Sequence, residues 1–291
     1  MLDDLADAVG RHCDGWWSET AVPRLTLVRL DQPIEPADLL YEPMVCFVAR
    51  GSKRTVAGDQ HRLAGPGTML FSSLEVPVTA AFEQVPYRSA VLRLDRGVLA
   101  DLLLDLDGPG PALPDPGGLA TAPMSAELID AVTRWVRLLD APAGIGPLAG
   151  PTEREIVYRL LLSPVGPLLR QHALAGSRAD QVRVAAGWLR RHYAETVSVE
   201  QVAAVAHLST ATLYRHFRAA TGLSPLQFQK RLRLQEARRL LVAGGLTVTG
   251  VAGRVGYASP TQFNREYRQA YGSPPARDAA RLRGELVPRP A

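Results

Sequence analysis

The segment that sets the architecture reads Ser209-Thr-Ala-Thr-Leu-Tyr-Arg-His-Phe-Arg-Ala-Ala-Thr-Gly-Leu-Ser-Pro225. A related segment follows 50 residues later as Ser259-Pro-Thr-Gln-Phe-Asn-Arg-Glu-Tyr-Arg-Gln-Ala-Tyr-Gly-Ser-Pro-Pro275. The identical pairs are Ser209/Ser259, Arg215/Arg265, Arg218/Arg268, Ala220/Ala270, Gly222/Gly272 and Pro225/Pro275. Self-similarity at a fixed offset predicts two copies of one folding unit.

Each copy is predicted to form a short helix, a turn and a second helix. Ser209 and Ser259 are suited to cap the second helices, because a hydroxyl accepts from a free backbone N–H. Gly222 and Gly272 are suited to end them, since glycine adopts the left-handed conformation there. Apolar residues upstream recur at helical spacing: Val199, Val202, Ala203 and Ala206, then Val248, Val251, Ala252 and Val255. These patterns predict helix-turn-helix units at about 199–220 and 248–271.

The second helix of each copy has an apolar face and a polar face. Leu213 with Phe217, and Phe263 with Tyr267, are expected in the core. The polar face suits nucleic acid, because Arg pairs with guanine, Gln or Asn with adenine, and Thr offers a hydroxyl and a methyl. Its residues are Thr212, Tyr214, Arg215 and Arg218, then Thr261, Gln262, Asn264, Arg265 and Arg268. Isolated arginines are usually solvated charges, but recurrence at equivalent positions favours DNA contact. Arg218 and Arg268 lie further along the helix and are expected to make phosphate or structural contacts.

The two copies are joined by a segment that is predicted to be a single helix. Ser224 is a plausible N-cap, Pro225 suits the first helical position, and Gly244-Gly245 closes the segment. Some 17 helical residues span about 25 Å. That length is about what is needed to place the second helices of the two units, the reading helices, in neighbouring grooves of a duplex.

The charge of the chain is unevenly distributed. The 291 residues have a net charge of +4, but residues from Ser177 onward carry 18 Lys and Arg against 7 Asp and Glu. The first 176 residues carry 15 and 22 respectively. An Arg-rich composition alone would explain many arginines in both halves, whereas only the second half leaves them uncompensated. We therefore expect the second half to face a polyanion.

The front part of the chain is predicted to be a β-sandwich or small barrel followed by helices. Short apolar strands are expected at 25–30, 44–49, 68–71 and 90–94. Pro- and Gly-rich segments at 107–118 and 141–151 are expected to be loops or linkers. Helical patterns follow at 126–140 and 152–163, and the second is interrupted by Ser163-Pro164 and Gly166-Pro167. These helices could pack on their own domain or pair between protomers.

Residues 179–283 resemble the DNA-binding domain of the AraC/XylS family of bacterial transcription regulators. The resemblance rests on the double helix-turn-helix, on the segment 221–241 and on Val255-Gly-Tyr-Ala-Ser-Pro-Thr-Gln-Phe-Asn-Arg-Glu-Tyr-Arg268. By position, it implies Ala211, Thr212, Tyr214 and Arg215, then Pro260, Thr261, Gln262 and Arg265, as base-reading candidates. The side chains of Ala211 and Pro260 cannot form hydrogen bonds to bases, which implies that some sequence discrimination occurs through methyl contacts or DNA shape. His207 departs from the glycine that often occupies the first turn.

Residues 38–95 look like the N-terminal domain of one subgroup of that family, through Tyr41-Glu-Pro-Met-Val-Cys-Phe-Val-Ala-Arg-Gly-Ser-Lys-Arg54 and Val76-Pro77-Val78. The resemblance implies a cupin-like domain that senses a ligand or dimerises. We thus expect an α+β protein with two domains: residues 1–176, a cupin-like barrel or sandwich with flanking helices, and residues 177–291, an all-α double helix-turn-helix. Residues that could line a small-molecule pocket, or equally belong to core or surface, are Tyr41, Phe47, Arg50, Phe71 and Arg88.

The expected function is sequence-specific binding of double-stranded DNA by a transcription regulator. A small-molecule effector, RNA polymerase and a second copy of the chain are candidate partners. Neither enzyme nor metal site is expected, because the sequence has no G-x-S-x-G, H-E-x-x-H or Walker loop and offers only His61 among the front strands. An RNA-binding or scaffolding protein is the other alternative, although its aromatics would be exposed on a sheet.

We expect the cytoplasm and no membrane, since no long apolar run or basic leader occurs. Cys13 and Cys46 do not form a disulfide framework, and Cys46 is expected to be buried. The sequence identifies neither the effector nor the operator, and it does not indicate whether the protein activates or represses transcription.

Overall fold

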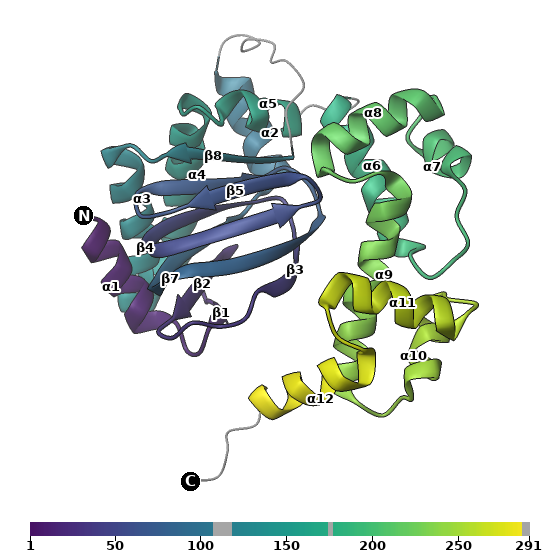
Figure 1. Ribbon diagram of the computed structural model, residues 1–291. Helices are drawn as coiled ribbons and strands as arrows, with labels where there is room; N and C mark the ends of the chain where they lie inside the picture. Colours follow the sequence, from purple (N-terminus) through teal and green to yellow (C-terminus); the bar gives the residue numbers. More distant parts are fainter. Residues whose placement is uncertain (107–117, 174–176, 287–291) are drawn as a thin grey trace.

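The computed structural model describes residues 1–106, 118–173 and 177–286. The front half, up to residue 173, consists of a run of strands with helices before and after it, and the back half, from residue 177 onward, is helical (Figure 1). The expected α+β fold class is confirmed. Of the Pro- and Gly-rich segment 107–118, only Gly118 lies within the described residues.

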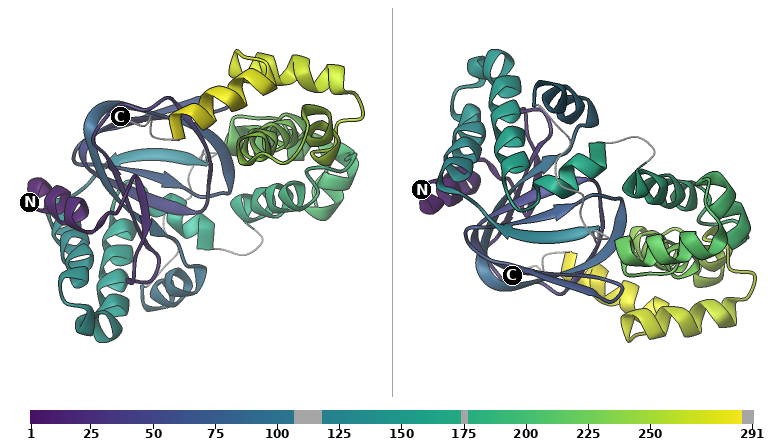
Figure 2. Two further views of the ribbon diagram at one scale, coloured as in Figure 1. Left: turned by 90° about the horizontal axis from the view of Figure 1, so that it is seen from below. Right: turned by 90° about the horizontal axis from the view of Figure 1, so that it is seen from above.

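The front half is built on one antiparallel sheet in which two long strands pair with each other and with shorter neighbours. The path runs β1-β2-β7-β4-β6-β8, with β3 on β7 and β5 on β4. The strands are β1 Trp17–Glu19, β2 Leu25–Leu30, β3 Ala37–Tyr41, β4 Met44–Ala57, β5 Gln60–Ala64, β6 Thr68–Ser72, β7 Val76–Arg93 and β8 Leu119–Pro123. β2 pairs with the second half of β7 and β3 with its first half, so the sheet curls towards a barrel (Figure 2).

Strand β4 bends at an irregularity in its pairing with β7. The register shifts between Val48 and Lys53, and Gly51 has φ +73°. A Cβ at Gly51 would lie 2.4 Å from the Gln84 carbonyl oxygen, so only glycine fits this approach. The shift changes which residues face the interior: Cys46 and Val48 point inward before it, and Lys53 and Thr55 are buried after it.

The outer face of the sheet is covered by helices of the front half. These are α1 Leu2–His12, α2 Arg96–Asp105, α3 Ala126–Arg137, α4 Ile145–Leu162 and α5 Gly166–Ala173. Val45 and Phe47 of β4 share a core with the buried stripes of α1, α3 and α4. Leu128, Val132, Trp135 and Val136 of α3 are buried, as their spacing predicts.

The prediction of a loop over 141–151 is wrong for its second part, because α4 already begins at Ile145. Pro147 lies in the first turn, where backbone N–H groups have no partner within the helix, so it disturbs nothing. Pro151 does remove one hydrogen bond inside the helix. Burial of Ile156 and Leu160 further along the same helix offsets that loss.

The back half contains α6 Arg178–Arg191, α7 Val199–Val205, α8 Thr210–Thr221, α9 Pro225–Ala243, α10 Val248–Arg254, α11 Pro260–Tyr271 and α12 Pro275–Leu286. It packs on the other side of the sheet from α3 and α4 (Figure 2). One apolar core runs from the barrel interior into α6, α7, α8 and the start of α9. A separate core joins the end of α9 to α10, α11 and α12. The first helix-turn-helix thus shares its core with the front half.

Candidate nucleic-acid interface

The first helix-turn-helix is formed by α7 and α8, and local hydrogen bonds set both starts. Ser198 and Gln201 form a capping box at α7, with the Ser198 Oγ accepting from the Gln201 N–H at 3.2 Å. Ser209 caps α8 by accepting from the Thr212 N–H, also at 3.2 Å. Gly222, with φ +71°, ends α8 in the left-handed conformation, as predicted.

The second helix-turn-helix, α10 and α11, repeats this construction. Thr247 caps α10, Ser259 caps α11 by accepting from the Gln262 N–H at 3.3 Å, and Gly272 ends α11 with φ +70°. The two turns also match. His207 adopts φ +54° where Gly256 adopts φ +89°, so the first turn keeps the geometry of the second without its glycine.

The aromatic residues of the repeat are core residues, as expected. Phe217 and Phe263 are fully buried, and Phe217 packs edge-on against Phe228 of α9 at 5.2 Å between ring centroids. The buried Tyr267 hydroxyl donates to Asp278 Oδ2 at 2.8 Å. Burial and this hydrogen bond raise the pKa of Tyr267 above its ordinary value. Both reading helices are therefore fixed by their inner faces.

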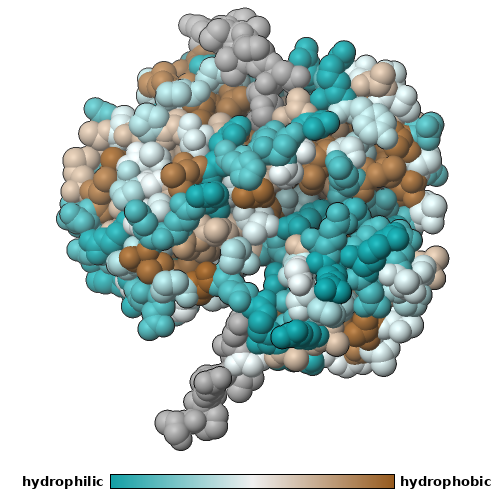
Figure 3. Space-filling model, viewed as in Figure 1, coloured by the Kyte–Doolittle hydropathy of each residue, from teal (hydrophilic) through white to brown (hydrophobic). Residues whose placement is uncertain are grey.

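The predicted DNA-contacting residues lie on the opposite face of each helix, away from the cores. Thr212 is half-buried; those exposed are Ala211, Tyr214, Arg215 and Arg218 on α8, and Pro260, Thr261, Gln262, Asn264, Arg265 and Arg268 on α11. Among the described residues, Arg215, Arg265 and Arg268 make no ion pair, whereas Arg218 lies 3.3 Å from Asp59 of the front half. In Figure 3 the face over α9 and α11 is predominantly hydrophilic.

Helix α9 joins the two units. Ser224 and Gln227 form a capping box at its start, with Pro225 in the first helical position, as predicted. Its 19 residues pack first on the core that includes Phe228 and Leu232 and then on the core that includes Leu234 and Leu241. One continuous helix therefore carries both units.

The C-terminal end of α8 is held by the front half, which the sequence did not predict. The Ala219 carbonyl accepts from Gln60 Nε2 at 2.7 Å, and the Ala220 carbonyl accepts from the Gly118 N–H at 2.6 Å. The Asp59 N–H donates to the Gly222 carbonyl at 3.4 Å. The last carbonyls of a helix have no partner inside it, so the front half supplies the cap of the first reading helix.

A buried carboxylate links the front half to α9. The side chain of Asp38 of β3 is 8% exposed, and it accepts from Arg238 at 3.1 Å and pairs with Arg231 at 2.5 Å. Arg238 also donates to Asp278 of α12 at 2.9 Å. These side chains are largely removed from water, so removing one of them would leave its partners buried without their ion pair.

The five candidate ligand-binding residues do not gather around one cavity. Phe47 and Phe71 are fully buried in the core beneath the front helices. Tyr41 is buried beside Thr55, 3.2 Å between hydroxyls. Arg50 pairs with Asp3 at 2.8 Å, and Arg88 pairs with Asp31. None of the five lines the cavity between α5, α6 and α8, and their role in binding stays a prediction.

Lys53 is a buried charge that sequence reasoning missed. It is 5% exposed, and its Nζ lies 3.5 Å from Cys46 Sγ and 5.2 Å from the centre of the Tyr41 ring. Among the described residues, no carboxylate forms an ion pair with it. Aromatic faces and the thiol thus surround the ammonium group in the barrel interior.

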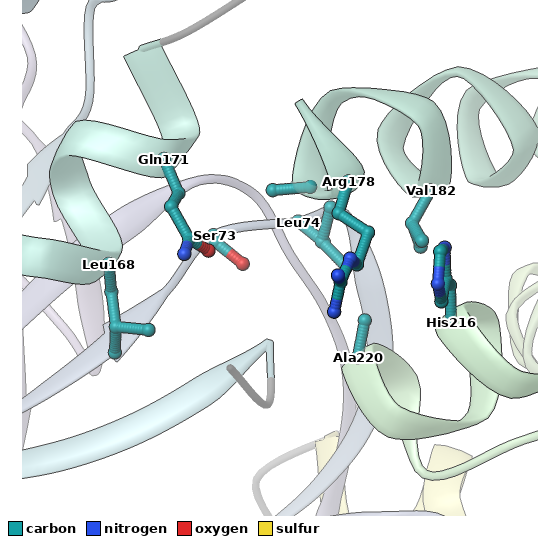
Figure 4. Close-up of a pocket in the computed structure, with 9 residues that line it drawn as sticks. Ser73, Leu74, Leu168, Gln171, Arg178, Val182, His216 and Ala220 are labelled. Atoms are coloured by element: carbon teal, nitrogen blue, oxygen red, sulfur yellow. The ribbon is translucent and has the colours of Figure 1, made fainter. Parts of the chain in front are cut away.

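A small cavity lies where α5, α6 and α8 meet the turn after β6 (Figure 4). Gln171, Ser73 and Leu168 line it from the front half, and Val182, His216 and Ala220 from the back half. Its volume is about 20 Å³, which accommodates a single water molecule but no larger ligand.

The described parts of the chain contain neither a cluster of metal ligands nor a membrane-spanning helix. There, no three His, Cys, Asp or Glu side chains are grouped as a metal ion would require. None of the helices described is long and apolar enough to cross a membrane.

The fold and the paired reading helices define a helix-turn-helix protein with an additional sheet-containing half. Residues 21–168 match the family model "AraC-type transcriptional regulator N-terminus", and residues 202–281 match the model "Helix-turn-helix domain". The first match covers half of the chain, and the chain belongs to the AraC/XylS family of transcriptional regulators.

Among known proteins, the HTH-type transcriptional activator RhaS of Escherichia coli (strain SE11) is 30% identical over 148 residues, 51% of this chain and 53% of RhaS. The match thus spans about half the length of this curated relative. The crystal structure of an apo ToxT variant from Vibrio cholerae strain SCE256 covers 91% of this chain and 97% of ToxT, with TM-score 0.57 and 9% identity. ToxT from V. cholerae O395 covers 93% and 100%, with TM-score 0.53 and 9% identity. At this identity the likeness concerns the fold.

Proposed function

We propose that this protein is a sequence-specific DNA-binding transcription regulator whose front half, residues 1–176, controls the DNA-binding half, residues 177–291. The observation that carries the proposal is the equivalence of Arg215 and Arg265. Both are exposed, both follow the capping serine by six residues on the second helix of their unit, and neither is paired within the described residues. An unpaired guanidinium on such a helix is free to form two hydrogen bonds to guanine.

Helices α8 and α11 would enter successive major-groove faces of one duplex. Thr212, Gln262 and Asn264 add hydrogen-bonding groups, while Ala211 and Pro260 offer only apolar contact. Arg218 and Arg268 lie one turn further along and would contact phosphate. The excess of basic residues in the second half adds sequence-independent attraction, which weakens as salt rises.

Control by the front half is supported by its contacts with the back half. Gln60 and Gly118 cap α8, and Asp38 holds α9. A ligand or a second copy that binds one arrangement of these contacts better than another would shift the population of DNA-competent molecules. Leu148, Tyr158 and Leu162 leave apolar side chains exposed along α4, which fits pairing with a second copy. As parts of the same proposal, the protein acts in the cytoplasm, contacts RNA polymerase and catalyses no reaction.

The test is fluorescence anisotropy with duplexes that cover the region upstream of the protein's own gene, at moderate salt. Specific binding should exceed binding to random duplex. Arg215→Ala and Arg265→Ala should each weaken specific binding by about 1–3 kcal/mol. Arg93→Ala, which removes an exposed arginine at the end of β7, is the matched control and should bind like the parent. Full sequence preference in both reading-helix variants would refute the proposal.

A further inference from the structure

Three helices of the back half begin with a capping serine and a glutamine three residues later, but only two of them form a capping box. The pairs are Ser198/Gln201 in α7, Ser224/Gln227 in α9 and Ser259/Gln262 in α11. In α7 and α9 the glutamine Oε1 accepts from the serine N–H, at 2.9 Å in both. In α11 the amide of Gln262 turns the other way, and its Nε2 donates to Glu266 Oε1 at 3.2 Å.

Glu266 is half-buried and is held from behind by the core of the second unit. Tyr257 donates its hydroxyl to Glu266 Oε2 at 2.9 Å. Tyr257 is 7% exposed and packs edge-on against Phe263, with 5.3 Å between ring centroids. Burial and the adjacent carboxylate raise the pKa of Tyr257 above its ordinary value, so the hydroxyl keeps the proton that it donates. Two hydrogen bonds in series thus connect the core to an exposed side chain of the reading helix.

The carboxylate fixes which end of the Gln262 amide faces outward. An ionised carboxylate only accepts hydrogen bonds, so the NH₂ group of Gln262 must face Glu266. The amide oxygen, which the capping boxes of α7 and α9 use, is not bonded within the described part of α11. Gln262 therefore keeps one acceptor, Oε1, and the second N–H of its amide for a partner.

An acceptor beside a donor matches adenine in the major groove, where the N6 amino group donates and N7 accepts. Guanine presents two acceptors, O6 and N7. To read guanine, Gln262 would have to place its oxygen either against O6 or against the Glu266 carboxylate. Both arrangements oppose two acceptors in an interface from which water is largely excluded, and that is costly.

We propose that Glu266 makes Gln262 select adenine over guanine at one base pair of the site bound by the second unit. Glu266 is a positioning residue, because it acts through Gln262. The inference rests on the proposed function for its DNA partner, whereas the hydrogen bond between the two side chains belongs to the free protein. The first unit has Thr212 and His216 at the equivalent positions, so this selection is confined to the second unit.

The test begins with selection of duplexes from a randomised pool by the full chain. The position that faces Gln262 is the one at which Gln262→Ala loses its base preference. There, anisotropy should show the parent binding the adenine duplex about tenfold more tightly than the guanine duplex. Glu266→Gln keeps the shape of the side chain, but its amide both donates and accepts, so either orientation of Gln262 becomes possible. The adenine-to-guanine ratio should then fall below about threefold.

The matched control is Glu236→Gln, which removes the same charge from α9, where Glu236 pairs with Arg239 at 2.7 Å. It should leave the adenine-to-guanine ratio unchanged, even where the loss of a negative charge raises affinity for both duplexes. Circular dichroism checks that each variant is folded. A parent that prefers guanine at this position, or an adenine preference retained in Glu266→Gln, would overturn the proposal.

A second measurement needs no DNA. In NMR spectra of the full chain with ¹⁵N-labelled glutamine, the Gln262 NH₂ signal is identified by its loss in Gln262→Ala. One of its two protons should shift upfield in Glu266→Gln, because the bond to a carboxylate is lost, and should not shift in Glu236→Gln. An unaltered signal in Glu266→Gln would also overturn the proposal. A chain that enriches no duplex refutes the proposed function, and the amide signal then decides by itself whether Glu266 holds Gln262.

Discussion

Replacing Gly222 by alanine tests whether the front half holds the first reading helix. Gly222 and Gly272 occupy equivalent positions with φ +71° and +70°, so alanine at either costs about 1–2 kcal/mol for the left-handed conformation. Their surroundings differ. A Cβ at Gly272 meets nothing within 4 Å, whereas a Cβ at Gly222 would lie 2.2 Å from the Ala57 carbonyl oxygen.

The turn between β4 and β5 must therefore withdraw from α8 in Gly222→Ala. The withdrawal breaks the Gln60–Ala219 hydrogen bond and the Asp59–Gly222 hydrogen bond. Two such bonds contribute about 2 kcal/mol together. Gly222→Ala should accordingly melt about 4–8 °C below Gly272→Ala, measured by circular dichroism.

A double-mutant cycle separates this contact from general destabilisation. Gly58, with φ +57°, faces Gly222 from the front half, and a Cβ there would lie 2.1 Å from the Gly222 carbonyl oxygen. Once either alanine has separated the two backbones, the second alanine should cost only its conformational penalty. The double variant should therefore be destabilised by less than the sum of the two single variants. Gly15→Ala, at φ +86° with nothing within 4 Å, is the front-half control. Additive losses, or equal melting of Gly222→Ala and Gly272→Ala, would refute the reasoning.

Two other perturbations have defined outcomes. Burial, helped by the nearby Arg96 and Arg183, lowers the pKa of His172 to about 4. As the pH drops, His172 is therefore protonated in the unfolded chain before it is protonated in the folded chain. The free energy of unfolding should fall by up to about 3 kcal/mol between about pH 6.5 and pH 4. Urea unfolding at a series of pH values should show that the free energy of unfolding falls less steeply with pH in His172→Gln than in the parent. An unchanged pH dependence would count against a neutral buried imidazole. Asp59→Asn should raise DNA affinity about two- to fivefold at low salt, because it frees Arg218 and removes a negative charge beside α8. Asp31→Asn is its control in the anisotropy assay. An equal gain in DNA affinity in both variants would show that Asp59 does not lie beside the bound DNA.

Much of the back half could be predicted because its signals are local and occur twice. Ser209, Ser259 and Ser224 cap helices through N–H groups three residues away, so a short stretch of sequence contains all that is needed. The paired glycines are equally local. Exposure of Arg215 and Arg265 followed from helical periodicity alone.

The contacts between the halves could not be predicted, because each partner carries an ordinary local signal. Gly58-Asp59 reads as a tight turn, and nothing in it indicates a helix end some 160 residues later in the chain. Lys53 was missed for a different reason. Strict alternation from the inward-facing Cys46 would point Lys53 outward, and only the register shift around Gly51 turns it into the interior.

The two cores of the back half meet along α9, between Leu232 and Leu234, with no break in the helix. A 19-residue helix extends about 28 Å, close to one turn of the duplex. A rod of fixed length does not stretch to follow separated recognition elements. Operators of this protein should therefore keep a constant interval between their two subsites, and inserting half a helical turn of base pairs there should abolish binding by one of the two units.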